Sequence, residues 1–339
     1  MPRYALLILP AFNRVYGESS IRLTRSELAV FSTYGLGGKI LASEETTIGG
    51  VPYVTFETSE PLTQPDISLL SNLSSVYAIF GIEGDLLRPL SMASLDRLSS
   101  DLITIQKYAG KTNEHFTKLL LNVTLLAGAK GLGERLSVFD PLCGRGTTLN
   151  QALMYGYDAY GLDVDGKDFE AYTAFIKTWL RNKRLKHTAE TVPVRRERAL
   201  VGRRLNVTFG LSKEAVKAGD VQHLAVVNAD TLKSRDFFKP RSFDALVTDT
   251  PYGVQHGSKG GGGLSRSPME LLRQAVPVWA ELLRPGGAMG ISWNTYGGKT
   301  SELAQILEGA GLQVMDYPDF EHWVDQAIVR DLIVARKPS

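Results

Sequence analysis

The sequence predicts an α/β protein built on a doubly wound, mostly parallel sheet. From residue 136 onward, short apolar runs typical of strands alternate with segments of helical periodicity, beginning with LSVFDPL and TLNQALMYG. Such alternation indicates right-handed crossovers between strands, with helices on both faces of one sheet. The last two predicted strands, LQVMDYPDF and RDLIVARKP, have no helix between them. We therefore expect them to form an antiparallel pair at one edge of the sheet.

Two shorter segments precede this domain. Residues 1–95 mix the apolar runs YALLIL, VPYVTF and VYAIFGI with the helix-like stretch SIRLTRSELAVFSTY, which predicts a small α+β domain. Residues 96–135 are expected to form a helical connector, because apolar residues at positions 116, 119, 120, 123 and 126 follow helical spacing. The doubly wound domain then occupies residues 136–339.

The composition is that of a globular protein with ample material for a core, since 43% of the 339 residues are hydrophobic and 22% are charged. No stretch approaches 18 consecutive apolar residues, so we expect no membrane span. The opening MPRYALLILPAF reads as a first strand rather than a signal peptide. The single cysteine excludes an intramolecular disulfide and a multi-cysteine metal site. We expect no metal, and a cytoplasmic location fits best.

Charge is distributed unevenly along the chain. The formal net charge is only +2, and residues 1–100 carry seven Lys and Arg against ten Asp and Glu. Residues 181–204, in contrast, carry nine Lys and Arg against two Glu. We interpret residues 181–222 as a basic insertion in the doubly wound domain. It is either a solvated loop or an arm that contacts the phosphates of a nucleic acid, and Arg195, Arg196 and Arg198 are the candidate contacts.

The first motif, DPLCGRGTT, directly follows a predicted strand and begins at Asp140. Gly144 and Gly146 allow a sharp turn and a close approach of the backbone to a ligand. Thr147 and Thr148 are placed to cap the next helix. A carboxylate at Asp140 does not suit a pyrophosphate, which argues against NAD, but it suits a ligand that carries an amino group or a sulfonium. The alternative is a glycine turn that binds no ligand.

Two further acidic signals follow the next predicted strands. Asp163 lies 19 residues after Gly144, a spacing at which an acidic side chain binds ribose hydroxyls in dinucleotide folds. Asp165 is a competing candidate, or a helix N-cap. Asp230 in the sequence Asn228-Ala-Asp follows another strand, and its carboxylate could accept a hydrogen bond from an adenine amino group. An aspartate after a strand is also a common turn former.

The fourth motif ends a strand with Asp249, Thr250, Pro251 and Tyr252. This pattern suits the activation of an amine that is conjugated to an aromatic ring. The Asp249 carboxylate and the Thr250 carbonyl would accept hydrogen bonds from the two N–H groups, and Pro251 would fix the geometry. Tyr252 would stack on the base. No strong general base is needed, because positioning and electrostatics can supply most of the acceleration. The alternative is a proline turn at a strand end.

The four motifs DPLCGRGTT, GLDVD, NAD and DTPYG, in this order, resemble the amino-directed class I methyltransferases. Among these, the chain most resembles the RNA-methylase family with a DPPY-type motif that contains the tRNA guanosine methyltransferases of archaea and eukaryotes. The resemblance covers residues 105–339. It implies a Rossmann-like seven-stranded sheet, S-adenosyl-L-methionine (SAM) as cofactor, an exocyclic amine of a guanosine in tRNA as acceptor, and an N-terminal ferredoxin-like domain that binds RNA.

The resemblance also implies further cofactor contacts. Cys143 falls within the glycine motif, and KYAGKTNEHFTKLLLNVTLL lies where the family has a helix that precedes the motif. Thr117 would then line the methionine pocket, together with Thr112, Asn113 and Phe116.

Two departures from the family pattern stand out. Thr250 replaces the first proline of the tetrapeptide. Because only its backbone carbonyl would be used, we expect Thr250→Pro to leave activity intact or raise it.

The second departure is in residues 1–100, which are acidic and too short for a ferredoxin-like unit plus a complete THUMP module. This weakens the expectation that the chain recognises tRNA more than the expectation that it transfers a methyl group. Residues 256–263, HGSKGGGG, are either a loop over the acceptor site or a flexible linker.

Three functional classes therefore stay open. The first is an RNA exocyclic-amine methyltransferase. The second is the same chemistry on DNA or on a protein side-chain amide. DNA enzymes would need a target-recognition domain, for which no suitable segment is visible, and amide enzymes typically begin the tetrapeptide with Asn. The third is a binding module without activity. The sequence predicts no oligomeric state.

Overall fold

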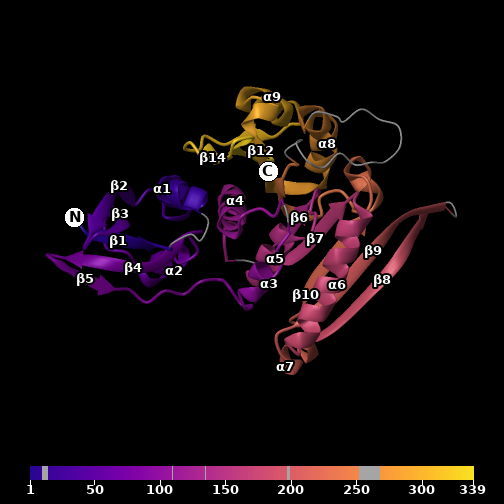
Figure 1. The fold of residues 1–339 in the computed structure, drawn as a ribbon, viewed down its shortest axis with the longest axis horizontal. Helices are drawn as coiled ribbons and strands as arrows, with labels where there is room; N and C mark the ends of the chain where they lie inside the picture. The colour runs from indigo at the N-terminus through magenta and orange to yellow at the C-terminus, as the bar shows by residue number, and fades with distance from the viewer. Residues whose placement is uncertain (10–13, 109, 134, 197–198, 252–267) are drawn as a thin grey trace.

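The computed structural model describes residues 1–9, 14–108, 110–133, 135–196, 199–251 and 268–339. The described residues form two sheets, one of five strands in the first 90 residues and one of ten strands in the remainder (Figure 1). Helix α4 lies between the two (Figure 1), and it packs on α1 on one side and on β11, β12 and β15 on the other.

The N-terminal sheet has the order β2-β3-β1-β4-β5, and every neighbouring pair is antiparallel. Its first four strands and two helices follow the β-α-β-β-α-β order of ferredoxin-like domains. Strand β5 extends the sheet as a hairpin with β4. The elements are β1 (Arg3–Ile8), α1 (Arg14–Gly35), β2 (Ile40–Ile48), β3 (Val51–Thr58), α2 (Gln64–Leu70), β4 (Val76–Glu83) and β5 (Leu86–Pro89).

The connector between the sheets contains α3 (Asp101–Thr104) and α4 (Glu114–Ala127). Most of α4 is buried, because it is covered by both domains. Asn122 in its middle donates hydrogen bonds to the buried carboxylate of Glu27 on α1 and to the carbonyl of Asn72, at 2.8 and 2.7 Å. The Tyr155 hydroxyl donates to the side-chain Oδ1 of Asn122 at 2.8 Å. This buried network joins the N-terminal domain to the larger one.

The larger sheet has the order β13-β15-β12-β11-β6-β7-β10-β9-β8, with β14 also paired to β15. Strands β10, β7, β6, β11 and β12 are parallel. Strand β15 is antiparallel to both β12 and β13, so it lies one position in from the edge. The predicted antiparallel ending is therefore confirmed. These strands are β6 (Ser137–Asp140), β7 (Asp158–Asp163), β10 (Gln222–Asn228), β11 (Phe243–Asp249), β12 (Leu283–Asn294), β13 (Gln313–Val314), β14 (His322–Asp325) and β15 (Ile328–Arg336).

Helices cover both faces of this sheet, as the alternation predicts. On β6, Val138 packs into the core cluster formed with α4, α5 and α6, whereas the adjacent Phe139 packs into the cluster formed with α8 and α9. Successive residues of a strand point to opposite faces, so one strand supplies both cores. The fold is thus doubly wound. The helices are α5 (Thr147–Met154), α6 (Gly166–Asn182), α8 (Pro268–Leu282) and α9 (Thr300–Gly309), with 3₁₀ turns η1 (Thr231–Asp236) and η2 (Thr295–Gly297).

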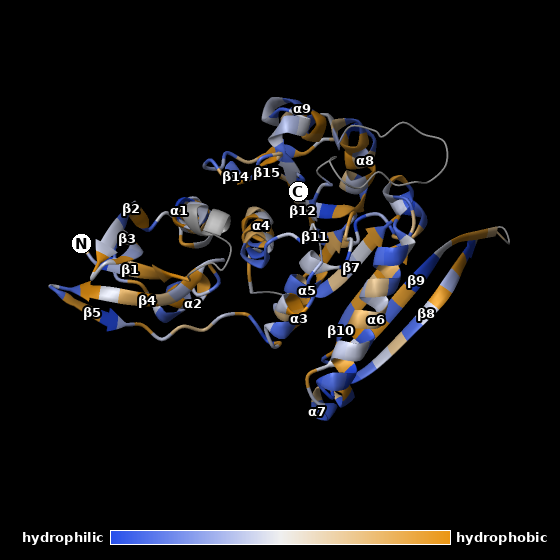
Figure 2. Ribbon diagram, in the orientation of Figure 1, coloured by the Kyte–Doolittle hydropathy of each residue, from blue (hydrophilic) through white to orange (hydrophobic). Residues whose placement is uncertain are grey.

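The basic insertion is not a loop. It forms a long antiparallel hairpin, β8 (Lys186–Arg196) and β9 (Ala199–Gly210), followed by α7 (Lys213–Lys217). Strand β9 pairs antiparallel with β10 and so adds the hairpin to the predicted seven-stranded sheet. Leu205, Val207 and Phe209 are buried at every second position of β9. Figure 2 shows hydrophobic as well as hydrophilic residues along both strands of the hairpin.

Candidate functional site

The strand-end aspartates predicted from the sequence lie along one edge of the larger sheet. Asp140, Asp163 and Asp249 are the last residues of β6, β7 and β11 respectively, three parallel strands that are neighbours in the order β7-β6-β11. Asp163 is directly paired with Asn228, the last residue of β10. The chain runs from β6 outward through β7 to β10 and then crosses back to β11. The topological switch point, where doubly wound folds bind ligands, is therefore between β6 and β11.

The loop after β6 needs both of its glycines. Gly144 and Gly146 have φ values of 48° and 79°, in the left-handed region that side chains disfavour. A Cβ at residue 146 would lie 2.3 Å from Cε2 of the buried Tyr172 ring, whereas one at residue 144 would meet nothing within 4 Å. The Gly144 amide donates to Asp163 Oδ2 at 2.8 Å. The loop is thus tied to β7 and open on the side of Gly144.

The other residues of this motif have different surroundings. Helix α5 begins at Thr147 and its N-cap is Gly146, so the expectation that Thr147 and Thr148 cap it is wrong. The Thr147 hydroxyl lies 3.1 Å from the hydroxyl of Tyr108, and Thr148 is buried. The Cys143 thiol is buried beneath the loop against Gly161, and burial raises its pKa well above the usual range.

Asp140 has an unusual environment for a carboxyl group. Only 3% of its surface is exposed, and its Oδ1 accepts a hydrogen bond from the Leu142 amide at 3.1 Å. Burial, with a smaller contribution from the charge of Asp163, raises the pKa of Asp140 to about 7. A cationic ligand beside this group would stabilise its ionised form, because opposite charges at short range favour ionisation.

Asp163 and Asp165 have distinct roles. Asp163 Oδ1 accepts from the Asp165 amide at 2.8 Å, which together with the Gly144 contact fixes the carboxylate at the strand end. Burial also raises the pKa of Asp163. Asp165 is exposed and accepts from the Lys167 amide at 2.7 Å, as the N-cap of α6. Asp163 is therefore the more sheltered of the two ribose candidates.

Asp230 lies farther out on the same edge. It is exposed, and its Oδ1 accepts from the Leu232 amide at 2.9 Å as the N-cap of η1. The neighbouring Asn228 donates to the carbonyls of Asp163 and Val164, both at 3.0 Å. Asn228 therefore braces the loop that carries Asp163, which the sequence alone did not indicate.

Three side chains from different elements contact the Asp249 carboxylate. Thr112, just before α4, donates to Oδ2 at 2.6 Å, and Ser292 on β12 donates to Oδ1 at 2.8 Å. The Arg330 guanidinium on β15 lies 3.8 Å from Oδ2. Only 14% of the Asp249 side chain and 5% of the Arg330 side chain are exposed. The carboxylate is thus oriented by hydroxyl donors on both oxygens and neutralised from one side.

Arg330 and His322 were not found from the sequence. The Arg330 guanidinium lies 4.6 Å from the centroid of the Phe116 ring, and the His322 ring lies 5.1 Å from the same ring. Burial lowers the pKa of His322 to about 4, so its imidazole is neutral at physiological pH. Phe116 therefore supports Arg330 next to Asp249 rather than standing alone as a pocket residue.

Thr250 is buried and closely held. Its amide and its hydroxyl both donate to the Ser292 carbonyl, at 2.9 and 3.0 Å. A proline at this position would lose both bonds, so we expect Thr250→Pro to lower stability, while its effect on activity stays a prediction. Pro251 is exposed. Tyr252 and residues 256–263 lie outside the described residues.

The residues before α4 also reach the glycine loop. Tyr108 is stacked by Arg145, whose guanidinium lies 4.8 Å from the ring centroid, and its hydroxyl contacts Thr147. Asn113 caps α4 by accepting from the amides of residues 115 and 116. The Thr117 hydroxyl donates to the Asn113 carbonyl at 3.2 Å, so it is directed along its own helix. Tyr108 is a site residue that the sequence analysis missed.

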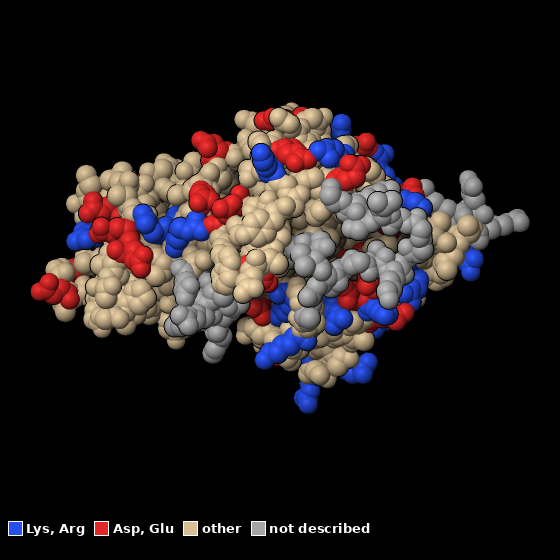
Figure 3. Space-filling view, turned by 45° about the horizontal axis from the view of Figure 1, so that its top comes forward, with Lys and Arg blue, Asp and Glu red and all other residues tan. Residues whose placement is uncertain are grey.

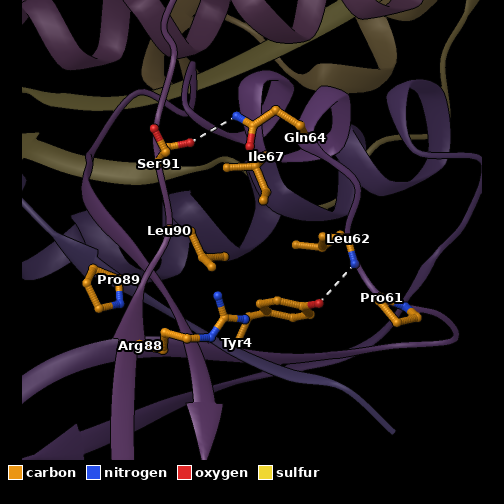
Figure 4. A pocket seen from close by; sticks show the side chains of 9 residues that line it. All are labelled: Tyr4, Pro61, Leu62, Gln64, Ile67, Arg88, Pro89, Leu90 and Ser91. Atoms are coloured by element: carbon orange, nitrogen blue, oxygen red, sulfur yellow. Dashed lines mark hydrogen bonds between the residues drawn. The ribbon is translucent and has the colours of Figure 1, made fainter.

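No helix in the described ranges is long and apolar enough to cross a membrane. Over the same residues, no group of three or more His, Cys, Asp or Glu side chains is placed to hold a metal ion. A cavity of about 280 Å³ lies in the N-terminal domain between α2 and the end of β5, with the Tyr4 ring, Leu62, Leu90 and Arg88 around it (Figure 4). It does not include any residue of the strand-end site.

Comparison with known proteins gave structural likenesses only. No family model matches the chain, and no curated protein matches it. A SAM-dependent methyltransferase from Methanosarcina mazei is 12% identical, covers 61% of this chain and 94% of its own, and has a TM-score of 0.38. The N-methyltransferase NodS from Bradyrhizobium japonicum is 14% identical over 66% of this chain and 95% of its own, with a TM-score of 0.40. At such values the function has to be inferred from the site itself.

Proposed function

We propose that this chain is a SAM-dependent methyltransferase that methylates an exocyclic amine of a nucleobase. The observation that supports this most strongly is the Asp249 carboxylate. It lies at the end of β11, across the switch point from the glycine loop, and is held by two hydroxyl donors and a buried arginine.

The residues around the glycine loop fit SAM. Gly144 leaves one side of the loop open for a close approach, and Asp163 presents a fixed carboxylate for ribose hydroxyls at the end of the next strand. Asp140 is a buried carboxyl that a positive charge would stabilise, and SAM carries both an amino group and a sulfonium. A pyrophosphate would instead place negative charge beside Asp140, so NAD does not fit.

SAM would supply an electrophilic methyl group, and the protein's own residues would position the nucleophile. The Asp249 carboxylate accepts an N–H of the acceptor amine, and the Thr250 carbonyl accepts the other. Both contacts strengthen as the nitrogen becomes positively charged, which makes them transition-state contacts. The nitrogen forms a bond to the methyl carbon while the carbon–sulfur bond breaks, and one N–H proton then leaves to solvent.

We further propose RNA as the acceptor, with a guanosine in tRNA as the substrate. Support comes from the likeness of the four motifs to the tRNA guanosine methyltransferases and from the basic hairpin on the same sheet. DNA methylation and protein amide methylation share the chemistry and are separated from this proposal by the identity of the methylated product.

Single-turnover methylation of RNA by Asp249→Ala tests the function. We expect a loss on the order of 10²–10³-fold in rate, the size found when one preorganised electrostatic partner is removed. SAM affinity should be nearly unchanged, because the proposed partner of Asp249 is the acceptor amine. Ser292→Ala is the control with the smaller change, since it removes one hydrogen-bond donor to Asp249 and leaves the carboxylate itself in place. A near-full rate in Asp249→Ala would rule out this acceptor site.

A further inference from the structure

The hairpin of the basic insertion reaches beyond the edge of the sheet on which the proposed site lies. Arg203 on β9 is paired with Asn228, the last residue of β10, and with Pro193 on β8. The three β8 residues after Pro193 and the four β9 residues before Arg203 therefore have no counterpart on β10. At about 3.3 Å per residue this end projects roughly 10–13 Å past the carboxyl edge. We call these residues, 194–196 and 199–202, the overhang.

The overhang is both cationic and partly apolar. Its sequence includes Arg195 and Arg196, of which Arg195 is exposed, and Leu200 on β9 is 59% exposed. Farther down the hairpin, Arg203 has a structural role, because it pairs with Glu170 at 2.9 Å and lies over the Phe169 ring.

Cations also occur at the opposite end of the insertion. Arg181 and Lys186 are exposed there, and Lys186 is paired with Gly210 at the end of the hairpin away from the site. Figure 3 shows Lys and Arg gathering along the lower border of the molecule, whereas acidic side chains stand out on the N-terminal domain at the left. Arg181 is in the last turn of α6 and Lys186 begins β8, so the far end of the insertion also carries two cations, at a different distance from the site.

The spacing from the overhang to Asp249 follows from the strand order. Strand β8, which carries Arg195 and Arg196, is five positions from β11 in the sheet, beyond β6, β7, β10 and β9. At about 4.8 Å between neighbouring strands, this separates β8 from Asp249 by roughly 24 Å. Stacked nucleotides rise about 3.4 Å each along one strand, so the gap corresponds to roughly seven nucleotides.

We propose that the overhang is an arm that binds RNA phosphates about seven nucleotides away from the base presented to Asp249. The inference rests on the proposed function and adds to it the part of the substrate that the arm contacts. Backbone phosphates fit this surface because clustered arginines release counterions from a polyanion, and the exposed leucine can pack on a ribose or base.

The test compares two double variants of the full chain, Arg195→Ala/Arg196→Ala in the overhang and Arg181→Ala/Lys186→Ala at the far end. Each removes two cations from the same insertion. Fluorescence anisotropy would measure binding of a labelled 20-nucleotide RNA and of a 4-nucleotide fragment of it, between 50 and 300 mM salt. SAM calorimetry on each variant would report whether the fold is intact.

For the overhang variant we expect weaker binding of the 20-nucleotide RNA and a salt slope smaller by about 1.4, since each lost phosphate contact removes about 0.7 on a single strand. The 4-nucleotide fragment and the far-end variant should behave as wild type. Equal effects of the two variants, or an equal effect on both RNA lengths, would rule out phosphate binding by the overhang. Either result would leave the proposed function unaffected. If the wild-type chain binds neither RNA, the proposed RNA substrate fails with it.

Discussion

SAM binding should depend on pH through Asp140. Burial, with the Asp163 charge adding to it, raises the pKa of Asp140 to about 7. A cationic ligand requires the ionised carboxylate, and below pH 7 the ionised fraction falls about tenfold per pH unit. The apparent Kd equals the intrinsic Kd divided by the ionised fraction. The apparent Kd should therefore fall about tenfold from pH 5 to pH 6 and about fivefold from pH 6 to pH 7. An α-amino group stays protonated over this range.

Calorimetry with SAM and with S-adenosylhomocysteine, on the wild type and on Asp140→Asn, would measure this dependence. Both ligands carry the amino group and only SAM carries the sulfonium, so the comparison identifies which cation Asp140 contacts. Asp140→Asn should bind with little pH dependence. A wild-type Kd that is flat from pH 5 to pH 7 would refute the assignment.

In the absence of ligand, the stability of the fold should change with pH in the opposite direction to SAM affinity. The reason is that Asp140 in the folded state keeps a proton that it has lost in the unfolded chain. Stability should therefore decrease as pH rises from about 4 to about 7.

Three substitutions give further predictions. Gly146→Ala should lower the free energy of unfolding by more than about 1–2 kcal/mol, because it adds the left-handed penalty to a clash with Tyr172, and an unchanged denaturation midpoint would contradict this. Thr250→Pro should lower the free energy of unfolding by about 1–3 kcal/mol, because it removes both hydrogen bonds to the Ser292 carbonyl. Thr250→Val removes only the hydroxyl bond and should lower it by about half as much. Equal denaturation midpoints for the two variants would show that the backbone bond adds nothing. Asp163→Ala should weaken SAM binding in calorimetry, and an unchanged Kd would place the ribose elsewhere.

Much of the larger domain follows from hydrophobic periodicity alone. Its strands and helices alternate so regularly that the doubly wound arrangement and the antiparallel β15 are predicted correctly. The hairpin was missed because charge dominates residues 181–204, although Leu205, Val207 and Phe209 give the two-residue period of a strand. Strand β2, ILASEETTI, is polar and largely exposed at the sheet edge, so it carries no apolar signal.

The site shows where sequence reasoning ends. Motif positions identify Asp140, Asp163 and Asp249, because parallel strands end at one edge of a sheet. Ser292 and Arg330 could not be assigned, since their contacts to Asp249 depend on the lateral order of β11, β12 and β15. That order is a long-range property, which local periodicity does not encode.

The central claim is methyl transfer to an exocyclic amine in RNA, and product identification tests it most directly. RNA from a strain that lacks this protein would be incubated with the purified chain and methyl-labelled SAM, digested to nucleosides and analysed by mass spectrometry. We predict label on the exocyclic nitrogen of guanosine, lost with Asp249→Ala. Label on a ring carbon, on a ribose or on no nucleoside at all would contradict the account.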